Sequence, residues 1–354
     1  MVALQKAHRA VIGGCELIEQ IGRGAMGSVF KARQLSMDRI VAIKLLSPRF
    51  AEDKEFVARF KREARAAARL SHPNVIQAVD VGQSQGYHYF VMEYVDGRTI
   101  SSLIEQHGAL SEAFCINAAV QIARAIQAAE RLGMVHLDIK PSNLMITLEG
   151  TAKLADFGVA MQTVDWASDV QPQDVFGTPE YISPEHALGT PNLDSRSDIY
   201  SLGATLYKML TGRRPFNGAS VREMVDARFL NDPASPQTLN PFLSDGICAV
   251  VAKMMARDRG ARYQNAAELI EDLEYVLARP STGAIAAAAS APQQPTHAPE
   301  PVPDSPVAQP VYVVEARKSA LGAVVGSFLL VAVGIATFLL VRNPEILANI
   351  LRTF

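Results

Sequence analysis

The chain has 354 residues, of which 49% are hydrophobic and 20% are charged. This composition excludes a mainly disordered protein and leaves room for one large domain or two ordinary ones. The formal net charge of −2 gives no electrostatic case for nucleic-acid binding, which needs a concentrated basic surface.

The three cysteines, Cys15, Cys115 and Cys248, lie at least 100 residues apart. An odd count without a CxxC motif or a Cys/His pairing argues against a disulfide framework or a zinc site. We expect buried, reduced thiols.

The first part of the chain is rich in predicted strands. Short runs of β-branched and aliphatic residues, punctuated by glycine, predict strands over Glu16–Gly22, Ser28–Ala32 and Ile40–Leu46. Helical periodicity predicts a helix over Glu52–Leu70, and Tyr87–Tyr94 predicts a further strand.

Helices dominate the region that follows. Apolar residues recur at helical spacing between Ser111, a suitable N-cap, and Gly133, a suitable C-terminal glycine. A small strand-rich part followed by a larger helical part predicts an α+β fold with two lobes and a cleft between them.

The C-terminal part of the chain differs in composition. Eight prolines between Pro280 and Pro310 predict an extended, flexible spacer. Ala320–Val341 is a run of 22 residues without a charge, and a helix of that length spans ~33 Å, enough for a hydrocarbon core of about 30 Å. A transmembrane helix in the lipid bilayer is the favoured interpretation, with a buried soluble helix as the alternative.

Three glycines, Gly22, Gly24 and Gly27, have GxGxxG spacing. The spacing alone is weak, because glycine-rich turns are common. A Rossmann glycine loop opens a helix, whereas Ser28–Ala32 continues as a predicted strand. A glycine-rich hairpin lets backbone N–H groups approach phosphate oxygens without a Cβ in the way.

Lys44 ends the run VAIK on the third predicted strand. A strand lysine is often only an exposed charge. Glu63 follows nineteen residues later in the predicted helix, and pairing would leave the ammonium positioned for nucleotide phosphates. Glu55 and Glu52 are alternative partners.

The run HLDIKPSN extends from His136 to Asn143, and the run DFG begins at Asp156. Phosphoryl transfer needs phosphates held in line, magnesium to neutralise charge and a group that accepts the hydroxyl proton. Asp138 is the candidate acceptor, and Asn143 and Asp156 carry the oxygen ligands that Mg²⁺ prefers.

In this order the motifs resemble those of the eukaryotic-like Ser/Thr protein kinases found in bacteria, over about residues 15–278. The resemblance implies the two-lobed protein kinase fold, with a small β-rich N-lobe and a larger helical C-lobe. It implies catalytic roles for Asp138, Lys140, Lys44 and Glu63, and magnesium ligands at Asn143 and Asp156. The implied ATP-binding residues are Ile21, Gly22, Arg23, Gly24, Ala25, Met26, Gly27, Ser28, Val29, Ala42, Lys44, Glu93 and Val95.

Further runs agree with the resemblance. MEYV, from Met92 to Val95, is similar to the hinge that binds adenine, with Met92 as gatekeeper. GTPEYISPE, ending at Glu185, is similar to the substrate-docking loop, with Ser183 where the family usually has alanine. The resemblance also implies that Asp198 caps the catalytic loop and that Arg262 pairs with Glu185.

The same resemblance bears on the substrate. Lys140 and Thr178 favour serine and threonine over tyrosine as acceptors in protein substrates. Leu137 replaces the arginine that most family members use to bind a phosphorylated activation loop. We therefore expect loop phosphorylation, for which Thr163 and Ser168 are candidate sites, to be less strictly required.

The expected organisation is a tail (1–14), a kinase domain (15–278), a Pro/Ala-rich linker (279–319), a transmembrane helix (320–341) and a short tail (342–354). The N-terminus has no signal-peptide run, and a kinase needs cytosolic ATP. We thus expect a single-pass protein of the cell membrane with a cytoplasmic kinase domain.

Alternatives remain open at this stage. Gly322 and Gly326 have GxxxG spacing, which arises by chance or reflects a homodimer that phosphorylates in trans. A membrane-anchored pseudokinase scaffold is the alternative function, although Lys44, Glu63 and Asp138 are all present. A small-molecule kinase is disfavoured by the docking loop.

Overall fold

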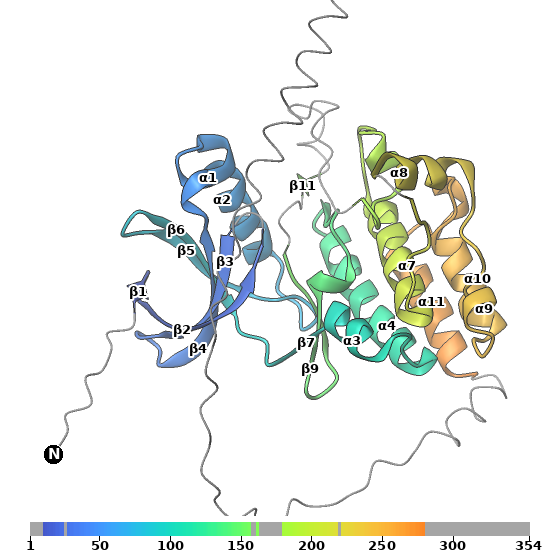
Figure 1. Cartoon of the computed structure of the whole chain (residues 1–354), viewed down its shortest axis with the longest axis horizontal. Coiled ribbons are helices and arrows are strands. Elements are labelled where there is room, and N and C mark those ends of the chain that lie inside the picture. Colours follow the sequence, from blue (N-terminus) through green and yellow to red (C-terminus); the bar gives the residue numbers. More distant parts are fainter. Residues whose placement is uncertain (1–9, 25–26, 157–160, 163–178, 219–220, 280–354) are drawn as a thin grey trace, which may run out of the picture. The chain divides into compact units, whose positions relative to one another are not determined.

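The computed structural model describes residues 10–24, 27–156, 161–162, 179–218 and 221–279. Strands dominate the first part of this region and helices the second (Figure 1). The predicted linker from residue 280 onward, the predicted transmembrane helix and the C-terminal tail lie outside the described residues. Among those that are described, no helix combines the length and the apolar character needed to cross a membrane.

The strand-rich lobe is built on one antiparallel six-stranded sheet, with the order β1-β2-β3-β4-β6-β5. The four predicted strands are found here, three of them longer by one to three residues and the fourth, Tyr87–Tyr94, shorter by one, and the structure adds β1 and β5. The strands are β1 Val11–Ile12, β2 Cys15–Arg23, β3 Gly27–Gln34, β4 Arg39–Leu46, β5 Ala78–Ser84 and β6 Tyr87–Glu93.

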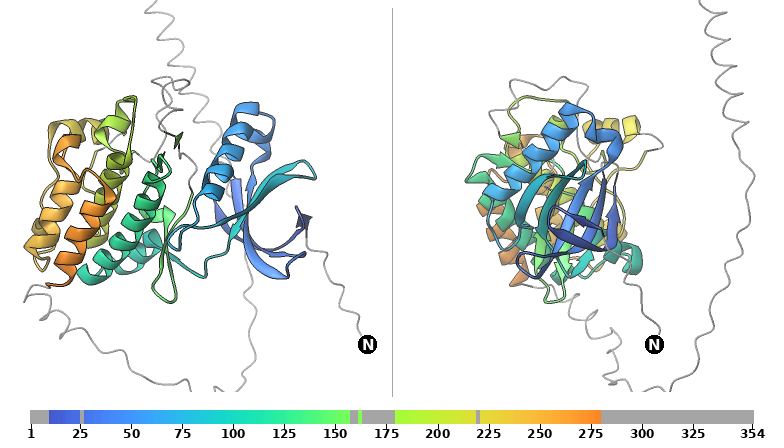
Figure 2. Two further views of the ribbon diagram at one scale, coloured as in Figure 1. Left: turned by 180° about the vertical axis from the view of Figure 1, so that it is seen from behind. Right: turned by 90° about the vertical axis from the view of Figure 1, so that its left-hand side faces the viewer.

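Helix α2 (Lys54–Arg69) confirms the helix predicted over Glu52–Leu70, and a short helix that was not predicted, α1 (Pro48–Ala51), precedes it. Helix α2 begins after Asp53, whose backbone is extended and whose carboxylate caps the helix through the N–H groups of Glu55 and Phe56. Helix α2 lies across the sheet (Figure 2).

Side-chain alternation divides the sheet into two buried faces. Ala42, Leu46, Phe90 and Met92 pack in one cluster with Phe60, Ala64 and Ala67 of α2. The other face holds a separate cluster of Ile12, Cys15, Ala32, Val41, Ile43, Leu45, Tyr89 and Val91. Lys44 belongs to the even-numbered set of β4, so its side chain leaves the sheet on the α2 side.

The second lobe is mainly helical and its core surrounds α4 and α7, most of whose side chains are buried. Its helices are α3 Ile100–His107, α4 Glu112–Glu130, α6 Pro184–Ala187, α7 Ser195–Thr211, α8 Val221–Leu230, α9 Pro236–Leu239, α10 Asp245–Met254 and α11 Ala266–Leu277. Short 3₁₀ helices are η1 Pro141–Asn143 and η2 Arg259–Ala261. Its strands are β7 Gly97–Thr99, β8 Met134–Val135, β9 Leu144–Thr147, β10 Ala152–Leu154 and β11 Met161–Gln162.

Helix α4 ends three residues before the predicted C-terminal glycine. The helix stops at Glu130, Arg131 caps it, and Gly133 adopts a left-handed φ of 64° in the turn that leads to β8. The three cysteines are free; Cys15 and Cys115 are buried as predicted, whereas Cys248 is only half-buried.

Candidate active site

The glycine-rich segment forms the turn between β2 and β3. The N–H of Gly24 donates to the carbonyl of Gly27 (2.8 Å), and Gly22 pairs with Val29 across the two strands. Ala25 and Met26 lie outside the described residues. A Cβ at Gly27 would overlap the carbonyl oxygen of Leu45, whereas a Cβ at Gly24 would meet open space. Packing of the sheet therefore requires a glycine at position 27, whereas packing does not require one at position 24.

Lys44 lies on β4, opposite Val29 of β3 and Phe90 of β6. Its Nζ is 3.0 Å from Oδ1 of Asp156, and the lysine side chain is only 14% exposed. Desolvation acts to raise the pKa of Asp156, but the charge and the hydrogen bond of Lys44 outweigh it and hold that pKa below its ordinary value. The structure thus joins a residue of the sheet to the start of the DFG run.

The predicted partner of Lys44, Glu63, lies on α2, and the position of its side chain is outside the described part of the chain. The alternatives Glu52 and Glu55 are exposed at the start of α2. The pairing of Lys44 with Glu63 therefore stays a prediction.

Asp198 on α7 fixes the backbone of the loop that follows β8 and carries Asp138. Its two carboxylate oxygens accept the backbone N–H groups of His136 (2.7 Å) and Leu137 (2.8 Å). Burial raises the pKa of Asp198 to about 7, although both N–H groups favour the ionised form. The prediction that Asp198 caps this loop is confirmed.

His136 ties the same loop to the segment before Asp156. Its Nε2 bonds the carbonyl of Ala155 (3.0 Å), and its Nδ1 accepts the N–H of Asp138 (3.2 Å). Burial lowers the pKa of His136 below its usual value, so the ring is neutral at pH 7 and these partners assign its proton to Nε2.

Asp138 lies among hydrogen-bond donors from its own loop. Lys140 Nζ is 2.7 Å from Oδ2 of Asp138, and Nδ2 of Asn143 is 3.0 Å from the same oxygen. Asn143 Nδ2 also donates to the carbonyl of Asp138 (2.9 Å). The structure therefore brings three of the predicted site residues into direct contact.

Two residues of this region have a left-handed backbone, Leu137 with φ 65° and Asp156 with φ 55°. Such a conformation is uncommon outside glycine and persists where hydrogen bonds hold it. The Leu137 N–H is fixed by Asp198, and the Leu137 side chain is only 2% exposed. An aliphatic group buried there offers no contact to a phosphate.

Asn143 and Asp156 fit a magnesium site by their donor atoms. Because Nδ2 of Asn143 faces Asp138, the amide oxygen is left as its remaining acceptor. The carbonyl of Asn143 accepts the N–H of Ala155 (2.8 Å), so the backbones that carry both oxygen ligands lie side by side. An amide oxygen and a carboxylate suit Mg²⁺.

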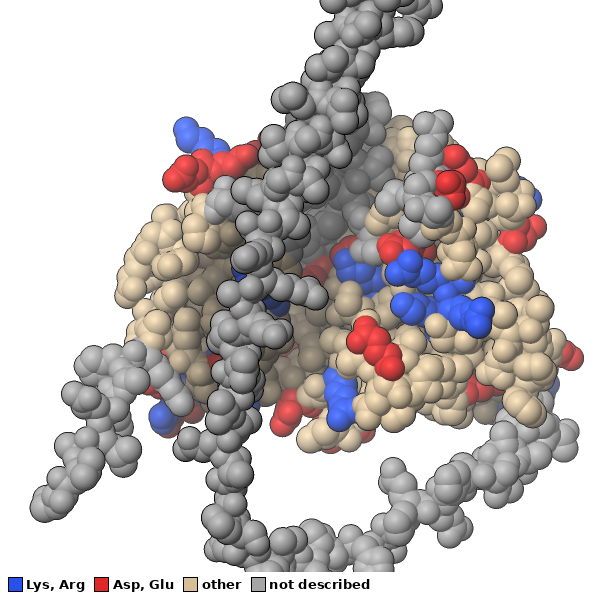
Figure 3. All heavy atoms as spheres, in the orientation of Figure 1, with Lys and Arg blue, Asp and Glu red and all other residues tan. Residues whose placement is uncertain are grey.

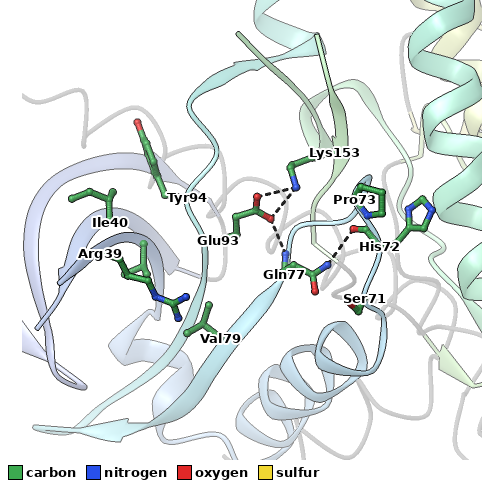
Figure 4. A pocket seen from close by; sticks show the side chains of 11 residues that line it. Arg39, Ile40, Ser71, His72, Pro73, Gln77, Val79, Glu93, Tyr94 and Lys153 are labelled. Carbon is green, nitrogen blue, oxygen red and sulfur yellow. Dashed lines mark hydrogen bonds and ion pairs between the residues drawn. The ribbon is translucent and has the colours of Figure 1, made fainter. Parts of the chain in front are cut away.

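The segment that joins the lobes begins at Glu93. The backbone N–H of Glu93 donates to the carbonyl of Gln77 (2.9 Å), and its carboxylate pairs with Lys153 of β10 (2.8 Å) and accepts the N–H of Gln77 (3.3 Å). Figure 4 shows Glu93 between these two residues at the side of a cavity of about 520 Å³. The Glu93 side chain thus braces the joining segment against the helical lobe.

The sequence did not predict the Glu93–Lys153 contact. Lys153 alternates with the buried residues Ala152 and Leu154 on β10, which places it on the other face of that strand. Alternation was the only available signal, and it could not identify a partner 60 residues away.

The docking loop is described from Pro179 onward, and Thr163, Ser168 and Thr178 lie outside the described residues. Glu185 forms two bonds to Arg262, at 2.7 and 2.8 Å, and accepts the hydroxyl of Ser197 (2.7 Å). The predicted pairing of Glu185 with Arg262 is confirmed.

Figure 3 shows lysine and arginine side chains gathered over the part of the helical lobe that carries α7. Arg214, just after α7, pairs with Glu180 of the docking loop.

Comparisons with known proteins agree with this arrangement. A model of the protein kinase domain family matches residues 15–273. A crystal structure of the PknI kinase domain of Mycobacterium tuberculosis matches with a TM-score of 0.61 and 26% identity, covering 76% of this chain and 98% of that domain.

Two relatives are similar in sequence. A probable serine/threonine-protein kinase of Clostridium perfringens is 39% identical over 266 residues, which are 75% of this chain and 38% of that protein. The serine/threonine-protein kinase PknB of Mycobacterium tuberculosis is 39% identical over 266 residues, 74% of this chain and 42% of PknB. The chain thus spans less than half the length of either relative.

Proposed function

The chain belongs to the protein kinase family, and from that premise we propose that it is a serine/threonine protein kinase, which transfers the γ-phosphoryl group of ATP to hydroxyls of protein substrates. The observation that carries the proposal is the contact of Asp138 with Lys140 and Asn143, in a loop that Asp198 fixes. The names of the two sequence relatives support the choice of serine and threonine, as do Lys140 and Thr178.

ATP lies between the lobes in this proposal. The segment Ile21–Val29 covers the phosphates with its backbone N–H groups. Ala42 lies against the adenine, and the backbone of Glu93 and Val95 bonds it. Lys44, paired with Glu63, orients the α- and β-phosphates.

The transfer step depends on Asp138. Its carboxylate aligns the substrate hydroxyl and accepts the proton as the oxygen attacks the γ-phosphorus, while the bond from that phosphorus to the β–γ bridging oxygen breaks and ADP leaves. Lys140, which contacts Asp138, steadies the negative charge on the transferring group. Asn143 and Asp156 hold Mg²⁺, which when bound neutralises phosphate charge.

The proposed organisation keeps the predicted boundaries: kinase domain 15–278, linker 279–319, transmembrane helix 320–341 and tails at 1–14 and 342–354. The span anchors the protein in the cell membrane, with the kinase domain on the cytoplasmic side where ATP is available. The GxxxG spacing of Gly322 and Gly326 supports a homodimer that autophosphorylates in trans.

The test uses the full-length chain, purified in a non-ionic detergent, with Mg²⁺, radiolabelled ATP and a general protein substrate. We expect phosphoserine and phosphothreonine, and a loss of roughly 10²–10⁴ in rate for Asp138→Asn, as for removal of a general base. Asp38→Asn is the matched control, since both residue types tolerate the left-handed φ of 50° found there. Equal incorporation by Asp138→Asn and the parent would contradict the proposal.

A further inference from the structure

Helix α8 carries an arginine whose side chain is enclosed by protein. Arg228 is 1% exposed, although α8 lies at the edge of the helical lobe (Figure 1) and the neighbouring residues Ala227 and Phe229 are partly exposed. Arginine is rarely buried this completely unless specific partners offset its lost hydration. A guanidinium in this position must therefore be held by particular contacts.

The contact that Arg228 makes is with the docking loop. Its Nη2 donates to the backbone carbonyl of Pro179 at 2.6 Å, across 49 residues of sequence. Pro179 is the first residue of the docking loop that the structure describes. A hydrogen bond from a charged donor is roughly twice as strong as one between neutral groups. This bond joins α8 directly to the backbone of the docking loop.

The rest of the Arg228 guanidinium is poorly compensated. Its Nε and Nη1 are buried without a hydrogen-bond partner, and no carboxylate lies within ion-pair distance of it, among the residues that the structure describes. Glu185, a buried carboxylate of the same lobe, bonds Arg262 instead. The ring of Phe216 lies 5.9 Å from the guanidinium carbon, which is a weak form of compensation.

This environment makes Arg228 unfavourable for stability. Burial lowers the pKa of Arg228, but a guanidinium stays charged at pH 7. A buried cation without a counter-ion costs stability, and apolar side chains of similar volume often replace buried charges without loss. Stability alone would therefore favour an apolar side chain at position 228.

A second arginine contacts the same loop from another element. Arg214, which follows α7, lies 3.2 Å from the carboxylate of Glu180. The hydrogen bond and the charge of Arg214 also act to lower the pKa of Tyr181, which burial raises to about 12. Arg214 is 45% exposed, so water screens its ion pair. The shielded contact of Arg228 is the firmer of the two.

We propose that Arg228 is a positioning residue of the docking loop, and that its bond to the Pro179 carbonyl holds this loop in the conformation that binds the protein substrate. The inference rests on the proposed function, in which the loop docks the substrate whose hydroxyl meets Asp138. The charge of Arg228 is buried for the sake of one hydrogen bond to that loop. The residue therefore favours substrate affinity at the expense of stability.

The test compares variants of the full-length chain in non-ionic detergent. Arg228→Met removes the charge and the bond but keeps a long unbranched side chain. Arg228→Gln, which is neutral and too short to span the contact, gives the same readouts if Arg228→Met does not fold. Arg228→Lys keeps one charged donor. Arg257→Met is the matched control, because Arg257 also donates to a carbonyl of α8, that of Phe229 at 3.0 Å, and pairs with Asp232 away from the docking loop.

The kinetic readout separates the protein substrate from the nucleotide, with myelin basic protein as the probe. Arg228→Met should raise the KM for myelin basic protein about tenfold and leave the KM for ATP within about twofold, because one charge-assisted hydrogen bond is lost. Arg228→Lys should return to within about threefold of the parent, since one carbonyl needs only one donor. The urea midpoint of Arg228→Met should equal or exceed that of the parent, which loss of a merely structural residue would not produce.

Amide hydrogen exchange over residues 180–183 reads the loop without phosphoryl transfer. We expect faster exchange there in Arg228→Met, and exchange like the parent's in Arg228→Lys and Arg257→Met. An unchanged KM for myelin basic protein in an active enzyme, a parallel rise of both KM values, or exchange equal to the parent's in Arg228→Met would overturn the proposal. A parent without kinase activity would contradict the proposed function instead, while the exchange data would still decide whether Arg228 holds the loop.

Discussion

At the scale of a single residue, Leu137 leads us to expect that catalysis depends less on activation-loop phosphorylation. Its backbone N–H is held by Asp198 and its side chain is buried, so the loop that carries Asp138 is fixed without a phosphate-binding arginine. We expect the double variant Thr163→Ala, Ser168→Ala to keep most of the parent rate in a substrate-phosphorylation assay. A loss as complete as that of Asp138→Asn would show that loop phosphorylation is required after all.

The Glu185–Arg262 pair makes stability depend on pH. Burial acts to raise the pKa of Glu185, but the bonds and charge of Arg262 and the Ser197 hydroxyl outweigh it and hold the pKa below 4.5. The stabilisation is therefore full above the ordinary pKa of glutamate and is lost as pH falls through the folded-state pKa. Urea unfolding at pH 7 should give Glu185→Gln a loss of about 3–5 kcal/mol, since Arg262 is fully buried.

The pH series distinguishes the charge from simple packing. The difference in unfolding free energy between parent and Glu185→Gln should shrink below about pH 4.5. Glu274→Gln is the control, because the Glu274–Arg124 pair is about half exposed on both sides and should contribute less than about 1 kcal/mol. A difference that stays constant with pH would mean that the carboxylate charge is not responsible.

Residue roles were predictable where several motifs fall in a fixed order. Asp198, Glu185 and Arg262 were predicted by resemblance and lie as expected. The Lys44–Asp156 contact was not predicted, because 112 residues separate the two positions and no local pattern joins them. Such contacts depend on how the two lobes close, which periodicity does not encode.

At the scale of one element, the glycine-rich turn needs Gly27 for the packing of β3 against β4, whereas nothing in the fold itself requires a glycine at position 24. Gly27→Ala should destabilise the fold by roughly 1–3 kcal/mol, because its Cβ would overlap the Leu45 carbonyl and force β3 and β4 apart. Gly24→Ala meets open space, so it should leave the urea midpoint nearly unchanged and raise the KM for ATP. If Gly24→Ala unfolded as easily as Gly27→Ala, the steric account of Gly27 would be wrong.

Elements were predictable in proportion to the strength of their pattern. β4 and β6 were predicted almost to the residue, because each is a short and mostly buried run rich in aliphatic, β-branched and aromatic residues, as expected of a central strand. β5 was missed because its sequence AVDVGQS is polar and only half-buried. Helix α1 was missed because its four residues are too few to show helical periodicity.

For the whole molecule, the proposed anchor predicts where the protein is found. The full-length chain should sediment with membranes and resist an alkaline carbonate wash, since 22 uncharged residues match the hydrocarbon core. A variant lacking residues 320–341, with the linker intact, should appear in the supernatant. Release of the full-length chain by the wash would contradict the anchor.

The contact between Lys44 and Asp156 has a thermodynamic consequence for the order in which ligands bind. In the structure the positive charge of Lys44 already pairs with Asp156, which is a proposed metal ligand. A metal ion that binds without nucleotide must therefore displace the Lys44 ammonium from this carboxylate. In the proposed function, nucleotide phosphates attract the Lys44 ammonium and leave the Asp156 carboxylate available to the metal. Each ligand then strengthens the other by the same factor, because coupling between two binding equilibria is reciprocal. If the proposed metal site is correct, we expect the protein without nucleotide to bind Mg²⁺ weakly and its nucleotide complex to bind it more tightly.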